Sequence, residues 1–310
     1  MVASHNNEIY RETPSYRLLT DAYRQPVEQI VSQYYQSKWR VIDFKDMNDY
    51  ASHPSAILSD GVHPVFVKLS LAKHGYDQFE VELMGLNWLS TQAGVLTPTP
   101  LGIVHVNNGV ILVLEAAEVI ERTPSAWREI GRTLAHIHQV KGDRFGFHMQ
   151  GYFGSLFQDN RTTEDWLTFY IERRLWPRLM GAIDSGFMPT SIIKQVEHFI
   201  TRLSGLGLPE CQPVLLHGDA QQNNYISTPN GAMVIDPAIY YGNPEVDLAY
   251  LDYFQPVPNE VFEGYQDILP IDPGFPGRRD LWRVAAYLAA VQAGGEDYLA
   301  PLVEAIRRYL

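Results

Sequence analysis

The chain has 310 residues, 45% of them hydrophobic and 19% charged, so it is long enough to bury a sizeable core in one large domain or two lobes. A formal net charge of −12 argues against nucleic acid and anionic membrane surfaces as partners, because both attract basic faces. The single cysteine, Cys211, excludes an intramolecular disulfide and a multi-cysteine zinc site, and it makes a reducing cytoplasm the simplest compartment.

The first 117 residues mix helical and strand-like patterns. Residues 1–13 are polar and lack the apolar segment of a signal peptide, and no stretch approaches the ~18 apolar residues of a membrane span. Apolar residues at helical spacing predict helices over 16–39 and 75–91. Short apolar stretches bounded by turn residues predict five strands, at 40–44, 55–59, 65–69, 101–106 and 110–114.

From Ser125 onward the pattern is mainly helical. The predicted helices cover 126–140, 163–183, 192–206, 246–253 and 279–310. Two short apolar runs interrupt them and predict strands; the first ends directly before His217, and the second, residues 232–235, ends directly before Asp236. This order predicts an α+β fold with a small mixed lobe over residues 1–117 and a helical lobe over residues 118–310.

Three polar side chains follow these two runs at defined spacing. Asp219 ends a His-Gly-Asp triplet, Asn224 follows five positions later, and Asp236 closes the second run. In protein kinases an Asp accepts the proton of the substrate hydroxyl, an Asn five residues on holds one Mg²⁺, and a later Asp holds the metal ions. We therefore expect Asp219 to be the catalytic base and Asn224 and Asp236 to bind Mg²⁺, which prefers oxygen ligands. The alternatives are a turn cap at Asp219 and a turn residue at Asn224, for which Asn223 is equally suited.

Other polar residues near this segment are expected to support it rather than react. His217 is expected to pack and hydrogen-bond so that the loop keeps its shape, with proton transfer as the alternative role. Asp247 opens a predicted helix, which it either caps or connects to backbone amides of the loop. His136 and His138 are two apart on a predicted helix, so they diverge and are poor joint ligands of one metal.

Lys68 lies on a predicted strand among apolar residues, where a lysine is costly unless it is paired. Protein kinases place such a lysine against nucleotide phosphates and a helix Glu. Glu82 is the favoured partner, with Glu80 as the alternative because the two point in different directions on the helix. An exposed strand lysine is the competing interpretation. The strand end from Glu115 to Ala117 is expected to offer backbone groups to an adenine ring, or is a plain strand end.

Taken in order, these segments resemble the fructosamine kinase (ketosamine kinase) family, within the aminoglycoside phosphotransferase-like branch of the protein-kinase fold. The resemblance extends from about residue 50 to near the C-terminus. It rests on Phe66-Val67-Lys68, Phe79-Glu80-Val81-Glu82, Arg144-Phe145-Gly146-Phe147, Glu164-Asp165-Trp166, His217-Gly218-Asp219 with Asn224, Asp236-Pro237-Ala238, Tyr241-Gly242 and Glu245-x-Asp247-Leu248-Ala249.

The resemblance implies a two-lobed protein-kinase-like fold and ATP-dependent phosphorylation of a sugar hydroxyl on a ketosamine, which is a glycated amine. Asp219 would be the base, Asn224 and Asp236 the Mg²⁺ ligands, and Lys68 the phosphate contact paired with Glu82. The implied cofactors are ATP and Mg²⁺, and the implied partner is a small sugar-amine. The sequence leaves the oligomeric state open.

Two positions depart from the family pattern. The family usually has Leu-Trp after the His-Gly-Asp triplet, and here those positions are Ala220 and Gln221, so Gln221 is expected to face the substrate. The loop over 52–55 lacks the glycines that usually approach the phosphates, which leaves Ser52, Ser55 or loop amides as phosphate contacts. Two other hypotheses stay open: a kinase of another hydroxyl, such as an aminoglycoside or amino alcohol, and a nucleotide-binding pseudokinase.

Overall fold

The computed structural model describes residues 14–48 and 53–310 and divides into two compact units. The first unit comprises the chain up to Leu86 together with Thr97–Val119, and the second comprises Asn87–Leu96 and Ile120–Leu310. The predicted division after residue 117 did not anticipate that residues 87–96, which include the end of a helix, belong with the second unit. In the described part of the chain, no helix is both long and apolar enough to span a membrane.

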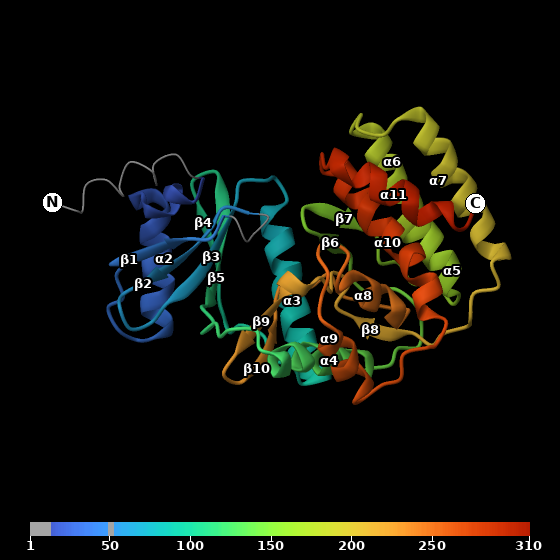
Figure 1. The fold of residues 1–310 in the computed structure, drawn as a ribbon. Coiled ribbons are helices and arrows are strands. Elements are labelled where there is room, and N and C mark those ends of the chain that lie inside the picture. Colours follow the sequence, from blue (N-terminus) through green and yellow to red (C-terminus); the bar gives the residue numbers. More distant parts are fainter. Residues whose placement is uncertain (1–13, 49–52) are drawn as a thin grey trace. The chain divides into compact units, whose positions relative to one another are not determined.

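The first unit is built around a five-stranded antiparallel sheet with the order β1-β2-β3-β5-β4 (Figure 1). Its strands are β1 (Asp43–Asp46), β2 (Ser55–Ser59), β3 (Val65–Ser70), β4 (Pro100–Val106) and β5 (Gly109–Glu115). All five predicted strands are present, but the first begins at Asp43 instead of residue 40. The Val41 N–H donates to the Glu28 carboxylate instead of joining the sheet.

Alternation along the strands gives the sheet two apolar faces. Ile111 and Val113 of β5 pack with Val27 and Val31 of α2 (Asp21–Tyr34). On the other face, Val110, Leu112 and Leu114 of β5 pack with Phe79 of α3 (Gly75–Ala93). Lys68 follows the same alternation on β3, so its side chain emerges on the α3 face.

The helix predicted over 16–39 is interrupted and shorter. A 3₁₀ turn, η2 (Pro14–Leu19), comes first, and Thr20 then has an extended backbone and precedes α2. The helix ends at Tyr34, because Gln36 has a left-handed φ of 52°.

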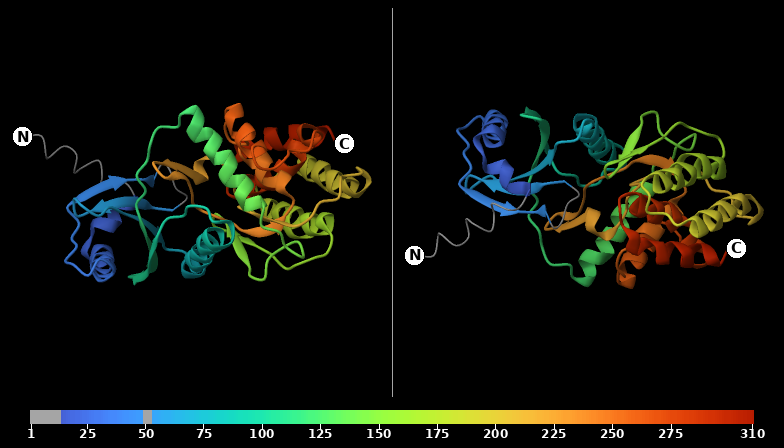
Figure 2. Two further views of the ribbon diagram at one scale, coloured as in Figure 1. Left: turned by 90° about the horizontal axis from the view of Figure 1, so that it is seen from below. Right: turned by 90° about the horizontal axis from the view of Figure 1, so that it is seen from above.

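The second unit is mainly helical, as predicted. Its helices are α4 (Pro124–His138), α5 (Trp166–Phe169), α6 (Trp176–Asp184), α7 (Thr190–Arg202), α8 (Pro244–Tyr250), α9 (Asn259–Gln266), α10 (Phe275–Gln292) and α11 (Leu299–Arg307), with 3₁₀ turns η5 (Leu203–Gly205) and η7 (Glu296–Tyr298). Figure 2 shows the yellow and red helices gathered together, with the C-terminus among them. The α10 helix packs against α6, α8 and α11, and α4 packs against α9. The sequence did not predict α9.

The helix predicted over 163–183 contains a π-helical segment, η4 (Tyr170–Leu175), between α5 and α6. Pro177 has no N–H to donate to the Arg173 carbonyl four residues earlier. That carbonyl accepts instead from the Arg174 guanidinium at 3.0 Å. The proline and the arginine together therefore explain why a regular α-helix does not continue here.

Three two-stranded ribbons complete the second unit. They pair β6 (Gly151–Phe153) with β7 (Leu156–Gln158), β8 (Val214–Leu216) with β11 (Tyr240–Gly242), and β9 (Tyr225–Thr228) with β10 (Gly231–Val234). The two apolar runs that bracket the polar segment therefore do not pair with each other. Each pairs with a strand that the sequence did not predict.

Candidate active site

The segment after β8 has a backbone that only glycine adopts easily. Gly218 has a φ of 80°, and a Cβ atom built there would lie 2.1 Å from the Ala238 carbonyl oxygen. This close approach lets the chain turn directly after His217, so that Asp219 leaves the end of the strand. The tight turn therefore depends on the central residue of the His-Gly-Asp triplet.

His217 holds this turn as a neutral ring. Its Nδ1 accepts a hydrogen bond from the Asp219 N–H at 3.2 Å, so the ring proton is on Nε2, which donates to the Ile235 carbonyl at 3.0 Å. Burial lowers the pKa of His217, which favours the uncharged ring. With both nitrogens occupied by backbone groups, the ring links β8 to the start of the Asp236 turn.

Asp247 anchors the same turn from α8. Its Oδ2 accepts from the His217 N–H at 2.7 Å and its Oδ1 accepts from the Gly218 N–H at 3.0 Å. His138 lies 3.2 Å from Oδ2 through Nε2, and its Nδ1 is 2.9 Å from the Tyr265 hydroxyl. Of the two roles expected for Asp247, the structure shows the amide-binding one, since Asn243 caps α8 instead. His138 is buried whereas His136 is exposed, so the two do not share a ligand.

Asn224 and Asn223 lie in different surroundings although they are adjacent. Asn224 is buried at the end of η6 (Gln222–Asn224), and Asn223 is exposed. The Asn224 Nδ2 donates to the Asp219 backbone carbonyl at 2.7 Å. This bond uses the nitrogen of the amide and leaves the Oδ1 oxygen, which is the atom that Mg²⁺ would select, on the opposite side of the group.

Asp236 has a left-handed φ of 53°, which costs a non-glycine residue about 1 kcal/mol or more. The strained residue follows β10 and lies close enough for its charge to act on Asp219. Burial raises the pKa of the Asp219 carboxyl to about 7, hydrogen bonds from Asn224 and Gln221 oppose this rise, and the charge of Asp236 adds to it. Asp219 Oδ1 is buried without a hydrogen-bond partner among the described residues.

These residues fit a magnesium site of the kind that relies on few protein ligands. The orphaned oxygen of Asp219 and the neighbouring Asp236 concentrate negative charge, and the amide of Asn224 supplies a neutral oxygen. No group of three His, Cys, Asp or Glu side chains with metal-binding geometry occurs in the described ranges. Mg²⁺ commonly keeps waters and phosphate oxygens in its shell, so the small donor set suits it better than a transition metal.

In the first unit, Lys68 is buried and ion-paired. Its Nζ lies 2.8 Å from Glu82 Oε1, and the two side chains are 6% and 15% exposed. Glu80 is exposed on the outer side of α3. The structure therefore places Glu82, and not Glu80, opposite the lysine.

The two remaining expectations for nucleotide contacts differ in outcome. Ser55 is fully buried, and its hydroxyl donates to the Met47 carbonyl at 3.2 Å, so its proton is not available to a phosphate. Ser52 lies outside the described residues. The Ala116 N–H donates to the Pro64 carbonyl. Ala117 is half-buried, and its N–H has no hydrogen-bond acceptor in the described ranges. Glu115 accepts from the Tyr35 hydroxyl at 3.2 Å.

Gln221 and Arg122 both contact the segment from Asp219 to Tyr225, and the sequence pointed only to the first. Gln221 is half-buried and its Nε2 lies 3.5 Å from Asp219 Oδ2, so the position expected to face the substrate reaches the candidate base. Arg122 was not anticipated: its guanidinium binds the carbonyls of Gln222 and Tyr225 at 2.9 and 2.5 Å and thereby fixes both ends of η6. Its distance from the loop in sequence explains why no local pattern revealed it.

Comparison with solved structures defines the class of protein. Over 93% of this chain and 99% of the other, the fold matches an aminoglycoside phosphotransferase with a TM-score of 0.60 at 13% identity. A Haemophilus somnus protein assigned to the fructosamine-3-kinases matches with a TM-score of 0.81 at 21% identity, over 93% and 97% of the two chains. The chain therefore has the two-lobed protein-kinase-like fold that its sequence predicted.

Sequence comparison identifies the family. The model of the fructosamine kinase family matches residues 23–310, so the chain belongs to this family. A Synechocystis protein named as a probable ketoamine kinase is 29% identical over 279 residues, which cover 88% of this chain and 92% of the relative. A rice protein named protein-ribulosamine 3-kinase, chloroplastic, is 31% identical over 251 residues, covering 79% of this chain and 72% of the relative.

Proposed function

We propose that this protein is an ATP-dependent kinase that phosphorylates a sugar hydroxyl of a ketosamine. The observation that carries the proposal is the arrangement around Asp219. This half-buried aspartate, whose Oδ1 is buried, lies beside a second aspartate and an oriented Asn224 amide, in a member of the fructosamine kinase family. A reducing cytoplasm is the compartment we propose, in line with the single cysteine.

Each residue has a distinct role in the proposed reaction. Asp219 accepts the proton of the attacking sugar hydroxyl, and the raised pKa of its carboxyl makes it a better proton acceptor. The Oδ1 of Asn224 and the carboxylate of Asp236 would hold Mg²⁺, which supplies charge neutralisation for the phosphates when bound. Lys68, held by Glu82, would contact a nucleotide phosphate. The Ala117 N–H and the Glu115 backbone would meet the adenine ring.

The decisive measurement is ADP release, in a coupled assay, from Mg·ATP with fructosamines and ribulosamines as acceptors. Asp219→Asn should lower kcat by about 10²–10⁴-fold, the usual contribution of a positioned base. Asn223→Ala is the control, because that side chain is exposed, and it should leave kcat unchanged. Full activity in the Asp219→Asn enzyme would remove this residue as the base.

The same assay separates the competing functions. Turnover with aminoglycosides or amino alcohols, and none with ketosamines, would show a kinase of another hydroxyl. If the protein is a pseudokinase, Mg·ATP would raise the thermal unfolding midpoint with no ADP released with any acceptor; saturation at about 100 times Kd stabilises a protein by about 2.7 kcal/mol.

A further inference from the structure

A small pocket in the second unit contains a buried arginine, Arg178. Arg178 of α6 is 7% exposed, and its guanidinium makes no hydrogen bond or ion pair with any residue that the structure describes. The central carbon of the guanidinium lies 5.9 Å from the centre of the Phe153 ring. Burying an isolated charge is costly, so such a group is normally paired.

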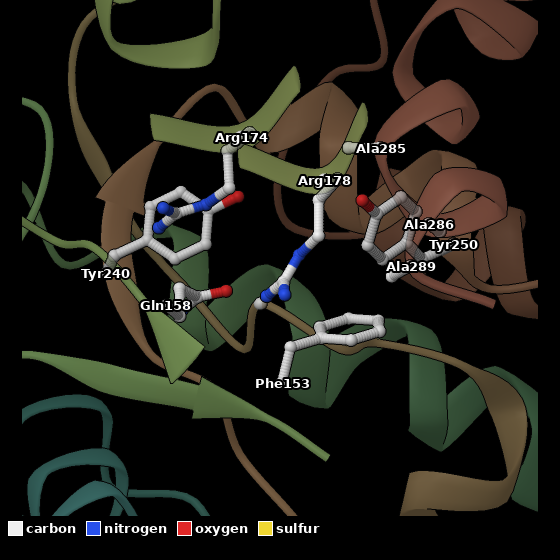
Figure 3. Close-up of a pocket in the computed structure, with 10 residues that line it drawn as sticks. Phe153, Gln158, Arg174, Arg178, Tyr240, Tyr250, Ala285, Ala286 and Ala289 are labelled. Atoms are coloured by element: carbon white, nitrogen blue, oxygen red, sulfur yellow. The ribbon is translucent and has the colours of Figure 1, made fainter. Parts of the chain in front are cut away.

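Arg174, one helical turn earlier in the same pocket, is by contrast bonded to the protein through both of its terminal guanidinium nitrogens. Its guanidinium donates to the Asp159 carbonyl and to Asn160 Oδ1, both at 2.7 Å, and stacks 4.0 Å from the centre of the Tyr240 ring. Figure 3 shows Arg174 lying against Tyr240, while Arg178 extends into the space between Gln158 and Phe153. The two arginines therefore differ in their contacts: Arg174 is hydrogen-bonded to the protein, and Arg178 has no such bond among the described residues.

The charge of the pocket points to an anionic ligand. Among the described residues, no acidic side chain lines it, although the protein as a whole carries a net charge of −12. Burial, and then the nearby charge of Arg174, lower the pKa of Arg178 to about 10, so the guanidinium is still charged at neutral pH but has no compensating carboxylate. Carboxylates match the planar fork of a guanidinium, which can donate two parallel hydrogen bonds to them.

The pocket also borders the candidate base. Gly218 forms part of its wall, and its Cα is ~3.8 Å from that of Asp219 along the chain. In the adduct of a sugar with the α-amine of a free amino acid, the carboxylate lies a few bonds from the sugar hydroxyls. A sugar hydroxyl at Asp219 would thus bring that carboxylate near Arg178.

We propose that Arg178 binds the carboxylate of the substrate, so that the preferred acceptor is the ketosamine of a free amino acid. A peptide or protein glycated at its N-terminal amine has an amide at the corresponding position, and one glycated at a lysine side chain has no carbonyl group there, so neither could form this ion pair. The proposal rests on the proposed kinase function, and it assigns to Arg178 the choice among ketosamines.

The test compares two acceptors that differ only in charge: N-fructosyl-glycine and N-fructosyl-glycinamide. Calorimetric binding without nucleotide and coupled ADP release are measured for the native protein, Arg178→Gln, Arg178→Lys and the control Arg307→Gln, whose side chain is exposed on α11. The native protein and Arg307→Gln should bind and phosphorylate the carboxylate compound about tenfold or more better than the amide. Arg178→Gln should lose this preference through a higher KM for the carboxylate compound, and Arg178→Lys should retain part of the preference.

The outcomes separate this proposal from the kinase assignment. Turnover of both acceptors with equal efficiency by the native protein would overturn the carboxylate site and leave the kinase standing. Carboxylate-selective binding that depends on Arg178, without ADP release, would support the site and overturn the kinase. A fructosyl-6-phosphate glycinamide serves as a further arm: if Arg178 selects this compound and not the glycine adduct, the pocket recognises a phosphate and the carboxylate assignment is wrong. The comparison of acceptors in the native protein needs no variant, so it stands even if Arg178→Gln fails to fold.

Discussion

Adjacent residues with the same side chain have different fates at positions 223 and 224. Asn224 is buried and its amide is oriented by the Asp219 carbonyl, whereas Asn223 points to solvent. The sequence offered both as turn residues, and spacing alone favoured Asn224. Burial supplies the physical distinction, because only a fixed amide presents its oxygen in one direction.

This difference predicts a change in metal dependence. Asn224→Ala should raise the Mg²⁺ concentration needed for half-maximal activity by about tenfold or more, since one of few protein ligands is removed. The measurement is a Mg²⁺ titration of ADP release at fixed ATP, with Asn223→Ala as the matched control. Equal Mg²⁺ requirements in both variants would exclude Asn224 as a ligand.

At the scale of elements, β3 and α3 position the Lys68–Glu82 pair. Alternation along β3 brings the lysine to the face of the sheet that α3 covers. Glu80 and Glu82 point in different directions from the helix, so only Glu82 meets the lysine. The apolar contacts around Phe79 hold the helix in that register. The ion pair thus follows from packing of the whole helix.

Glu82→Gln should raise the KM for ATP by about tenfold, because the lysine loses the charge that orients it. The change in the free energy of unfolding should be smaller than the change in the free energy of ATP binding. Glu80→Gln, an identical change on the exposed side of the same helix, should leave the KM unchanged. Initial rates at varied ATP and saturating acceptor provide the comparison. The Lys68 role would be refuted if both variants bind ATP like the native protein.

A second pair of elements, α4 and α9, is joined by acidic and basic side chains. Arg128 and Arg132 of α4 both bind Asp267, which follows α9, at 2.6 to 2.8 Å. Hydrogen bonds from Arg128, and then from Arg132, lower the pKa of the Asp267 carboxyl to about 2. The carboxylate therefore stays charged in the folded protein at a pH where an unfolded Asp, with a pKa of about 3.9, already binds protons.

The lowered pKa of Asp267 makes the stability of the folded protein depend on pH. Because the folded pKa is the lower one, the contribution of Asp267 to stability is complete above about pH 4 and is lost as the pH falls towards 2. Asp267→Asn should therefore flatten the acid side of the stability curve over this window and lower stability at pH 7. Urea unfolding at a series of pH values measures this, and an unchanged pH slope in the variant would contradict the assignment.

At the scale of the whole molecule, the net charge of −12 affects the approach of substrates. A ketosamine with a protonated amine and no carboxylate is cationic, so the acidic protein attracts it, and salt screens this attraction. The zwitterionic adduct of a free amino acid is attracted less.

With Mg·ATP held saturating, added KCl should lower kcat/KM for fructosyl-glycinamide by about twofold or more between 0.02 and 0.2 M. The effect on fructosyl-glycine should be smaller. The measurement is a salt series of initial rates for both acceptors. A kcat/KM that is independent of salt for the cationic compound would show that the overall charge has no part in substrate capture.

Much of the fold could be read from the sequence because the informative patterns are local. Period-two and period-3.6 apolar spacing located the five strands of the first unit and most helices of the second. The errors have local physical causes as well: Pro177 and Arg174 change a predicted α-helix into a π-helical segment, and Glu28 binds the Val41 amide so that β1 starts late. The ribbon partners β9 and β11 are too short to show a period.

The sequence by itself pointed to the candidate reacting groups, because Asp219, Asn224 and Asp236 are close along the chain and have the spacing expected of a kinase site. Only the tertiary structure decided which other residues hold these groups in place and which predicted contacts are buried. Asp247 meets His138 across 109 positions, and Ser55 proves to be buried. Arg178 faces a pocket whose walls come from residues between 153 and 289. Such contacts depend on how distant elements pack, and no local pattern of residues encodes that.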